Sequence, residues 1–183
     1  MKKAFKRDKP KLFSYPIEDI EGIGEVLGEK LKDAGAHTTK ELLAKCASSG
    51  HAAFAKEAGL SEGQIRKFAA IADLMQVRGI STEYGELVHL VGIETFTQLP
   101  GQDPVALAAK MEELVKSKAL VPHAGRMQVR KVPTAKVVAN WIDEAQKLAE
   151  AQNLVDANLG TGTSSGAEGA VGEGGPNAKW PKT

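Results

Sequence analysis

The chain has 183 residues, of which 42% are apolar and 26% are charged, and its formal net charge is +1. This composition excludes a disordered polyelectrolyte, and the single Cys46 excludes an intramolecular disulfide or a multi-cysteine zinc or iron–sulfur site. Aromatic residues make up only 5%, which favours helices over a β-sandwich.

The first predicted segment is a basic arm, residues 1–16. Residues 1–12 hold six Lys/Arg and one Asp without hydrophobic periodicity. No apolar stretch follows them, so we do not expect a secretory signal. The cations of this arm that we predict to contact phosphate are Lys2, Lys3, Lys6 and Arg7.

An internal repeat predicts two related halves, residues 17–76 and 77–150. Residues 20–31 (IEGIGEVLGEKL) match residues 77–88 (VRGISTEYGELV) at an offset of 57. In each copy a Gly-Ile turn opens a short helix, a second Gly closes it, and a Thr begins the next helix. The repeat therefore predicts the same short helical unit twice.

Helix-start signals follow in both halves. Capping boxes are predicted at Thr38-x-x-Glu41, Ser61-x-x-Gln64 and Thr95-x-x-Gln98, and an N-cap with an N1 proline at Asp103-Pro104. The helix after Ser61 has its counterpart in a helix beginning at Thr134, which places Trp141 on an apolar face. No alternating run indicates a sheet, so we predict an all-α fold of about eight short helices.

Residues 17–43 resemble a helix-hairpin-helix motif, and residues 77–99 are a weaker second copy. Over residues 17–150 the chain resembles a bacterial family of tandem helix-hairpin-helix-like domains of unknown function. In nucleic-acid-binding members of the wider superfamily, the hairpin turn directs backbone N–H groups at a phosphate. The resemblance implies a phosphate cradle and a nearby lysine at Gly22, Ile23, Gly24 and Lys30, with a second turn at Gly79 and Ile80.

The charges around these turns leave a second interpretation open. Four carboxylates, Glu18, Asp19, Glu21 and Glu25, lie within four residues of the first turn and would repel a phosphate. The second turn has Arg78 beside it, but Ser81 replaces the second glycine. The alternative is that both turns are corners that pack helices, with their isoleucines in the core.

A basic segment, residues 116–136, contains no acidic residue. Its cations, which we also predict to contact phosphate, are Lys116, Lys118, Arg126, Arg130, Lys131 and Lys136. Two prolines and a glycine indicate a loop. The segment carries +6 and residues 1–12 carry +5, so the rest of the chain carries −10. The alternative is a solvated loop that pairs with acidic helices.

Residues 151–183 form a Gly/Ser-rich tail, which we expect to be flexible unless a partner holds it. Trp180, beside Pro181, is a candidate anchor on a partner, whereas Trp141 is expected in the core.

The dispersed histidines and the absence of a nucleotide-binding loop predict no enzyme activity, metal, cofactor or small-molecule substrate. No stretch reaches the ~18 apolar residues of a membrane span, and we expect a cytoplasmic protein. The first functional hypothesis is a non-catalytic module that binds nucleic acid or another polyanion independently of sequence. The alternative is a protein–protein adaptor or structural subunit, whose body docks while the arm and tail lie on neighbours.

Overall fold

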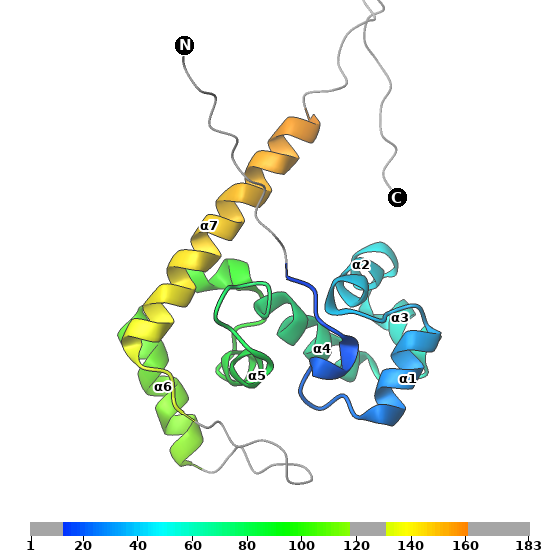
Figure 1. Ribbon diagram of the computed structural model, residues 1–183, viewed down its shortest axis with the longest axis horizontal. Helices are drawn as coiled ribbons and strands as arrows, with labels where there is room; N and C mark the ends of the chain where they lie inside the picture. The colour runs from blue at the N-terminus through cyan, green and yellow to red at the C-terminus, as the bar shows by residue number, and fades with distance from the viewer. Residues whose placement is uncertain (1–12, 118–130, 161–183) are drawn as a thin grey trace, which may run out of the picture.

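The computed structural model describes residues 13–117 and 131–160, and within these ranges the fold is all-α (Figure 1), as predicted. The described residues form seven α-helices, two 3-10 helices and no β-strand. In chain order the elements are η1 (Ile17–Asp19), α1 (Glu25–Asp33), α2 (Thr39–Ser49), α3 (His51–Ala58), α4 (Glu62–Leu74), α5 (Thr82–Leu90), η2 (Phe96–Gly101), α6 (Pro104–Lys116) and α7 (Ala135–Gly160).

The predicted capping residues begin their helices. At the start of α2, the Thr38 hydroxyl accepts the Glu41 amide at 3.2 Å, while the Glu41 carboxylate accepts the Thr38 amide at 3.1 Å. The same reciprocal pair begins α4 at Ser61. Asp103 accepts the amide of Ala106 at 2.7 Å and begins α6. Each cap of this kind contributes about 1 kcal/mol, so these local signals define the helix starts.

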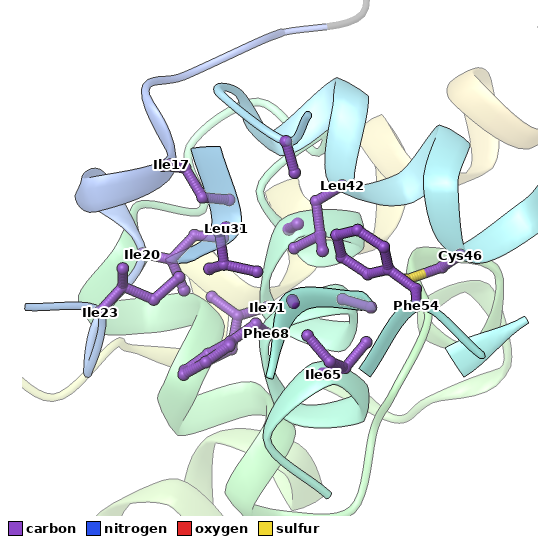
Figure 2. Close-up of a cluster of buried hydrophobic side chains, with 14 of the residues drawn as sticks. Ile17, Ile20, Ile23, Leu31, Leu42, Cys46, Phe54, Ile65, Phe68 and Ile71 are labelled. Atoms are coloured by element: carbon purple, nitrogen blue, oxygen red, sulfur yellow. The ribbon is translucent and has the colours of Figure 1, made fainter. Parts of the chain in front are cut away.

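The first hydrophobic core surrounds α4, which packs against α2, α3 and α5. Figure 2 shows its side chains converging from η1, α1, α2, α3 and α4. Six of them are fully buried: Ile17, Leu31, Leu42, Phe54, Ile65 and Ile71. Because every helix from α1 to α4 contributes, this core holds the N-terminal part of the fold together.

A second core lies under α7, which runs along one side of the molecule and packs against α6 and η2 (Figure 1). Its buried members include Leu87, Leu99, Met111, Val138 and Trp141. The interior position that we predicted for Trp141 is confirmed, since only 2% of this residue is exposed.

Polar contacts join the two cores across the packed pair α4 and α5. The amide of Glu21 donates to the Thr82 hydroxyl at 2.7 Å, 61 residues away. The amide of Phe96 donates to the Asp73 carboxylate at 2.8 Å. These bonds tie the segment before α1 to α5, and α4 to the start of η2.

Two elements differ in length from the sequence expectation. The Thr95 helix is a six-residue 3-10 helix, because Pro100 lies inside it and cannot donate a backbone hydrogen bond. Helix α7 continues to Gly160, ten residues past the expected start of the tail, since neither Gly nor Pro interrupts residues 135–159. None of the helices in the described part of the chain is long and apolar enough to cross a bilayer.

Candidate nucleic-acid interface

The first turn, residues 22–24, packs closely on α4. Gly22 has φ of 90°, and the amide of Ile23 donates to the Ile20 carbonyl at 3.0 Å. The Ile23 side chain is buried in the first core. A Cβ on Gly22 would lie 3.8 Å from both the Lys67 ammonium and the Phe68 ring. The glycine therefore provides the left-handed backbone of a tight corner.

The charged groups that flank the first turn have partners within the fold. Glu18 crosses the buried Gly28 and forms an ion pair with Lys32 near the end of α1, which lowers the pKa of its carboxyl. Lys30 lies 3.5 Å from the carbonyl of Gly59, which ends α3. The lysine that we predicted beside a phosphate is thus directed at a helix C-terminus, where a cation is favoured.

The second turn, residues 79–81, is covered by an aromatic ring. Gly79 has φ of 96°, and the amide of Ile80 donates to the Val77 carbonyl at 3.1 Å. A Cβ on Gly79 would lie 3.1 Å from Trp141 Nε1 and 3.3 Å from its Cδ1. Ile80 is buried in the second core. The indole and the left-handed backbone both require glycine at this turn.

One end of the basic segment is attached beside this covered turn. The ring of Tyr84 packs on Trp141 with 5.0 Å between ring centroids. The Tyr84 hydroxyl donates to the Lys131 carbonyl at 3.1 Å. Lys131 re-enters the described chain just before α7, so the structure brings the end of the basic segment next to the second turn.

The predicted phosphate contacts are only partly described. Lys131 and Lys136 are exposed, and so is Arg78 beside the second turn. Lys116 is exposed and forms an ion pair with Glu112 at 2.6 Å on α6. The remaining predicted contacts lie outside the described residues: Lys2, Lys3, Lys6, Arg7, Lys118, Arg126 and Arg130.

The sequence reading missed a polar cluster between α4 and α5. Lys67 forms an ion pair with Glu86 at 2.6 Å, and only 8% of Glu86 is exposed. Glu86 Oε2 and His89 Nδ1 are buried, and neither atom has a hydrogen-bond partner among the described residues. Burial lowers the pKa of His89, which favours the neutral imidazole.

The spacing Glu86-x-x-His89 is visible in the sequence and places both residues on one face of α5. We overlooked it when we judged the histidines too dispersed for a helical pair. Within residues 13–117 and 131–160, no group of three or more His, Cys, Asp or Glu is arranged to hold a metal ion.

A groove of about 500 Å³ lies between α2 and α4. Its floor is apolar and made mainly of small residues, Leu43, Cys46, Ala47, Ala69 and Ala70. Its polar rim comprises Lys40, His51, Arg66, Asp73, Gln76, Glu94 and Thr95. Burial also raises the pKa of the Cys46 thiol, which disfavours the reactive thiolate.

Asp73 is the most perturbed acid of this groove. Burial raises the pKa of its carboxyl to about 6. The Phe96 amide and the Gln76 side-chain amide each donate to it at 2.8 Å and favour the charged form. Desolvation is the larger effect, so this carboxyl changes charge at mildly acidic pH.

Comparison with known proteins gives a family and no activity. Residues 21–148 match a protein family described as a domain of unknown function (DUF4332). No curated protein and no solved structure matches the chain.

Proposed function

The chain belongs to the family of domains of unknown function DUF4332, and we propose that it is a non-catalytic module that binds nucleic acid or another polyanion independently of sequence. The observation that carries this proposal is the attachment of the basic segment at Lys131 to Tyr84, beside the second turn. Phosphate binding of this kind depends on the number and placement of cations and carries no base readout.

We further propose that residues 17–76 and 77–150 are two copies of one helix-hairpin-helix-like unit. Bonds at positions 57 residues apart support this. Gly22 and Gly79 have φ of 90° and 96°. The amide of Gly28 donates to the Gly24 carbonyl at 2.8 Å, and the amide of Gly85 donates to the Ser81 carbonyl at 2.7 Å.

On this interpretation, the basic segment contains an insertion in the second copy. The aromatic residue on the first turn is Phe68, and the one on the second turn is Trp141, 73 residues later. The offset is thus 57 before α6 and 73 at α7, so about 16 residues have been added between these helices. Loops added to a repeated scaffold are typical carriers of binding residues.

The distribution of charge supports the second turn over the first as the scaffold for binding. Residues 13–117 and 131–160 hold 13 Lys/Arg and 20 Asp/Glu, so the described body is acidic. Arg78, Lys131 and Lys136 are exposed near the second turn or at the start of α7. The Trp141 indole covers the turn itself, so the side chains, rather than a cradle of amides, would contact phosphate.

A titration with short duplex DNA and with structured RNA over a salt series tests this proposal. We expect the logarithm of the affinity to fall linearly with the logarithm of the salt concentration. Neutralising Arg126, Arg130 and Lys131 should reduce both the affinity and the salt slope. The matched control neutralises three exposed lysines on other helices, Lys40, Lys56 and Lys110, and should retain most of the binding. Absence of binding at low salt would refute the proposal.

The second candidate function is a protein–protein adaptor or structural subunit of a larger assembly, with the arm and tail lying on neighbours. The apolar groove between α2 and α4 favours it, because such concave surfaces receive apolar side chains. Removal of residues 161–183 should then abolish binding of a specific co-purifying protein. An unchanged set of bound proteins would contradict a role for the tail.

A further inference from the structure

The groove between α2 and α4 is an apolar surface that polyanion binding leaves without a role. We propose that residues 178–182 of the same chain occupy it, with the Trp180 side chain on the floor formed by Ala47, Ala69 and Ala70. This inference does not depend on the proposed polyanion binding.

The groove suits one large aromatic side chain. Its volume is about 500 Å³, and alanines from both α2 and α4 line its floor. Small residues on facing helices leave space that a large ring can fill, and a buried aromatic side chain removes about 150–250 Å² from water. The chain has two tryptophans, and Trp141 is already buried in the second core. Trp180 is therefore the tryptophan that can still gain by burial.

The groove also lies near the place where α7 ends. Thr95 lies on its rim, and Thr97, two residues later, lines a cavity together with Asn153 of α7. From Asn153 the helix continues seven residues to Gly160, a rise of about 10 Å. The Gly-rich stretch 161–177 has 17 residues, and a coil of that composition and length spans about 20–25 Å. Residues 178–182 can therefore reach the groove.

Charge on the rim fits the same occupant. The carboxylates Asp73 and Glu94 lie at the Thr95 end, because Glu94 precedes Thr95 and Asp73 accepts the amide of Phe96. Trp180 is flanked by Lys179 and Lys182, and residues 174–183 contain no acidic residue. A chain that arrives from α7 passes this acidic end first, so its lysines would meet opposite charge.

Acrylamide quenching of Trp180 fluorescence in the full chain tests the proposal. Subtracting the signal of a Trp180→Phe variant leaves that of Trp180 alone. We expect a quenching constant at least about threefold lower than that of a free peptide of residues 174–183, since a buried indole excludes the quencher.

Two variants address the groove directly. Ala69→Leu fills its floor, and Glu94→Lys, an exposed change that leaves the floor intact, reverses the charge of its rim. Both should raise the quenching constant toward the peptide value. Ala109→Leu, on the exposed face of α6, should leave it unchanged. Should Ala69→Leu fail to fold, the Glu94→Lys measurement decides.

Equal quenching in the full chain and the free peptide would overturn the proposal. Protection that grows with protein concentration would also overturn it, because the occupant would then come from a second copy. Protection that requires an added protein would identify a partner's groove in place of this one and would overturn it as well.

Discussion

Trp141 lies directly against Gly79, with its Nε1 atom 3.1 Å from the position that a Cβ on that glycine would occupy. The two residues are 62 positions apart, so this contact fixes the start of α7 against the turn that precedes α5. Tyr84 packs on the same indole and donates to the Lys131 carbonyl, which extends the contact to the end of the basic segment.

Gly79→Ala should therefore lower the free energy of unfolding by about 2–4 kcal/mol, because it adds both a left-handed alanine and a clash with the indole. Gly92→Ala is the matched control: its φ is 93°, and nothing lies within 4 Å of its Cβ position. It should cost only the backbone term of about 1–2 kcal/mol. Urea denaturation of both variants measures the difference, and equal losses would show that the indole contact has no energetic weight.

The sequence predicts the parts of this arrangement that depend on near neighbours. The capping boxes at Thr38 and Ser61 and the cap at Asp103 can be read from spacing, since each partner lies three residues away. The partners of Gly79 and Lys67 cannot be read in this way. They are set by how α7 and α5 pack, and no local pattern encodes that packing. The groove is similar, because its alanines acquire meaning only once α2 and α4 face each other.

Tyr84→Phe removes the hydroxyl that binds the Lys131 carbonyl and retains the ring that packs on Trp141. The loss in unfolding free energy should be small, about 0.5–1.5 kcal/mol, as for one hydrogen bond. If the proposed function holds, polyanion affinity should fall further than stability does, because the basic segment loses its attachment. Thermal denaturation and a low-salt titration give the two values. An unchanged affinity would show that attachment at Lys131 does not position the cations.

Asp73→Asn should change how stability depends on pH. The pKa of Asp73 is about 6 in the fold against 3.8 as the model-compound value, so the folded state binds the proton more tightly. Its contribution is greatest at low pH and is lost as the pH rises from about 4 to 6, by at most about 3 kcal/mol. Relative to the Asn variant, the native chain should thus lose stability over this window and stay level above it.

Comparing Asp73→Asn with the native chain is necessary because His89 acts in the opposite direction. Its pKa is lowered by burial, so protonation of His89 opposes folding as the pH falls through its range. Urea denaturation from pH 4 to pH 8 of both proteins, with the exposed Asp33→Asn as control, separates the Asp73 contribution. A pH-independent difference between the Asp73 variant and the native chain would contradict the raised pKa.

The ion pair between Lys67 and Glu86 should respond unequally to loss of its two partners. The Lys67 side chain is 38% exposed, whereas that of Glu86 is 10% exposed and has one oxygen without a partner. Lys67→Met leaves a buried carboxylate without its cation and should cost about 3 kcal/mol of unfolding free energy. Glu86→Gln leaves a lysine that can still reach water, so its cost should be smaller, about 1 kcal/mol.

The double variant Lys67→Met/Glu86→Leu should recover most of the loss, because it removes both charges from the contact between α4 and α5. Apolar replacement of a buried pair is often neutral or stabilising. The double-mutant cycle in urea thus distinguishes two roles. Recovery would show that desolvation of Glu86 is the dominant cost at this contact, whereas additive losses would show that the pair itself stabilises the packing of α4 on α5.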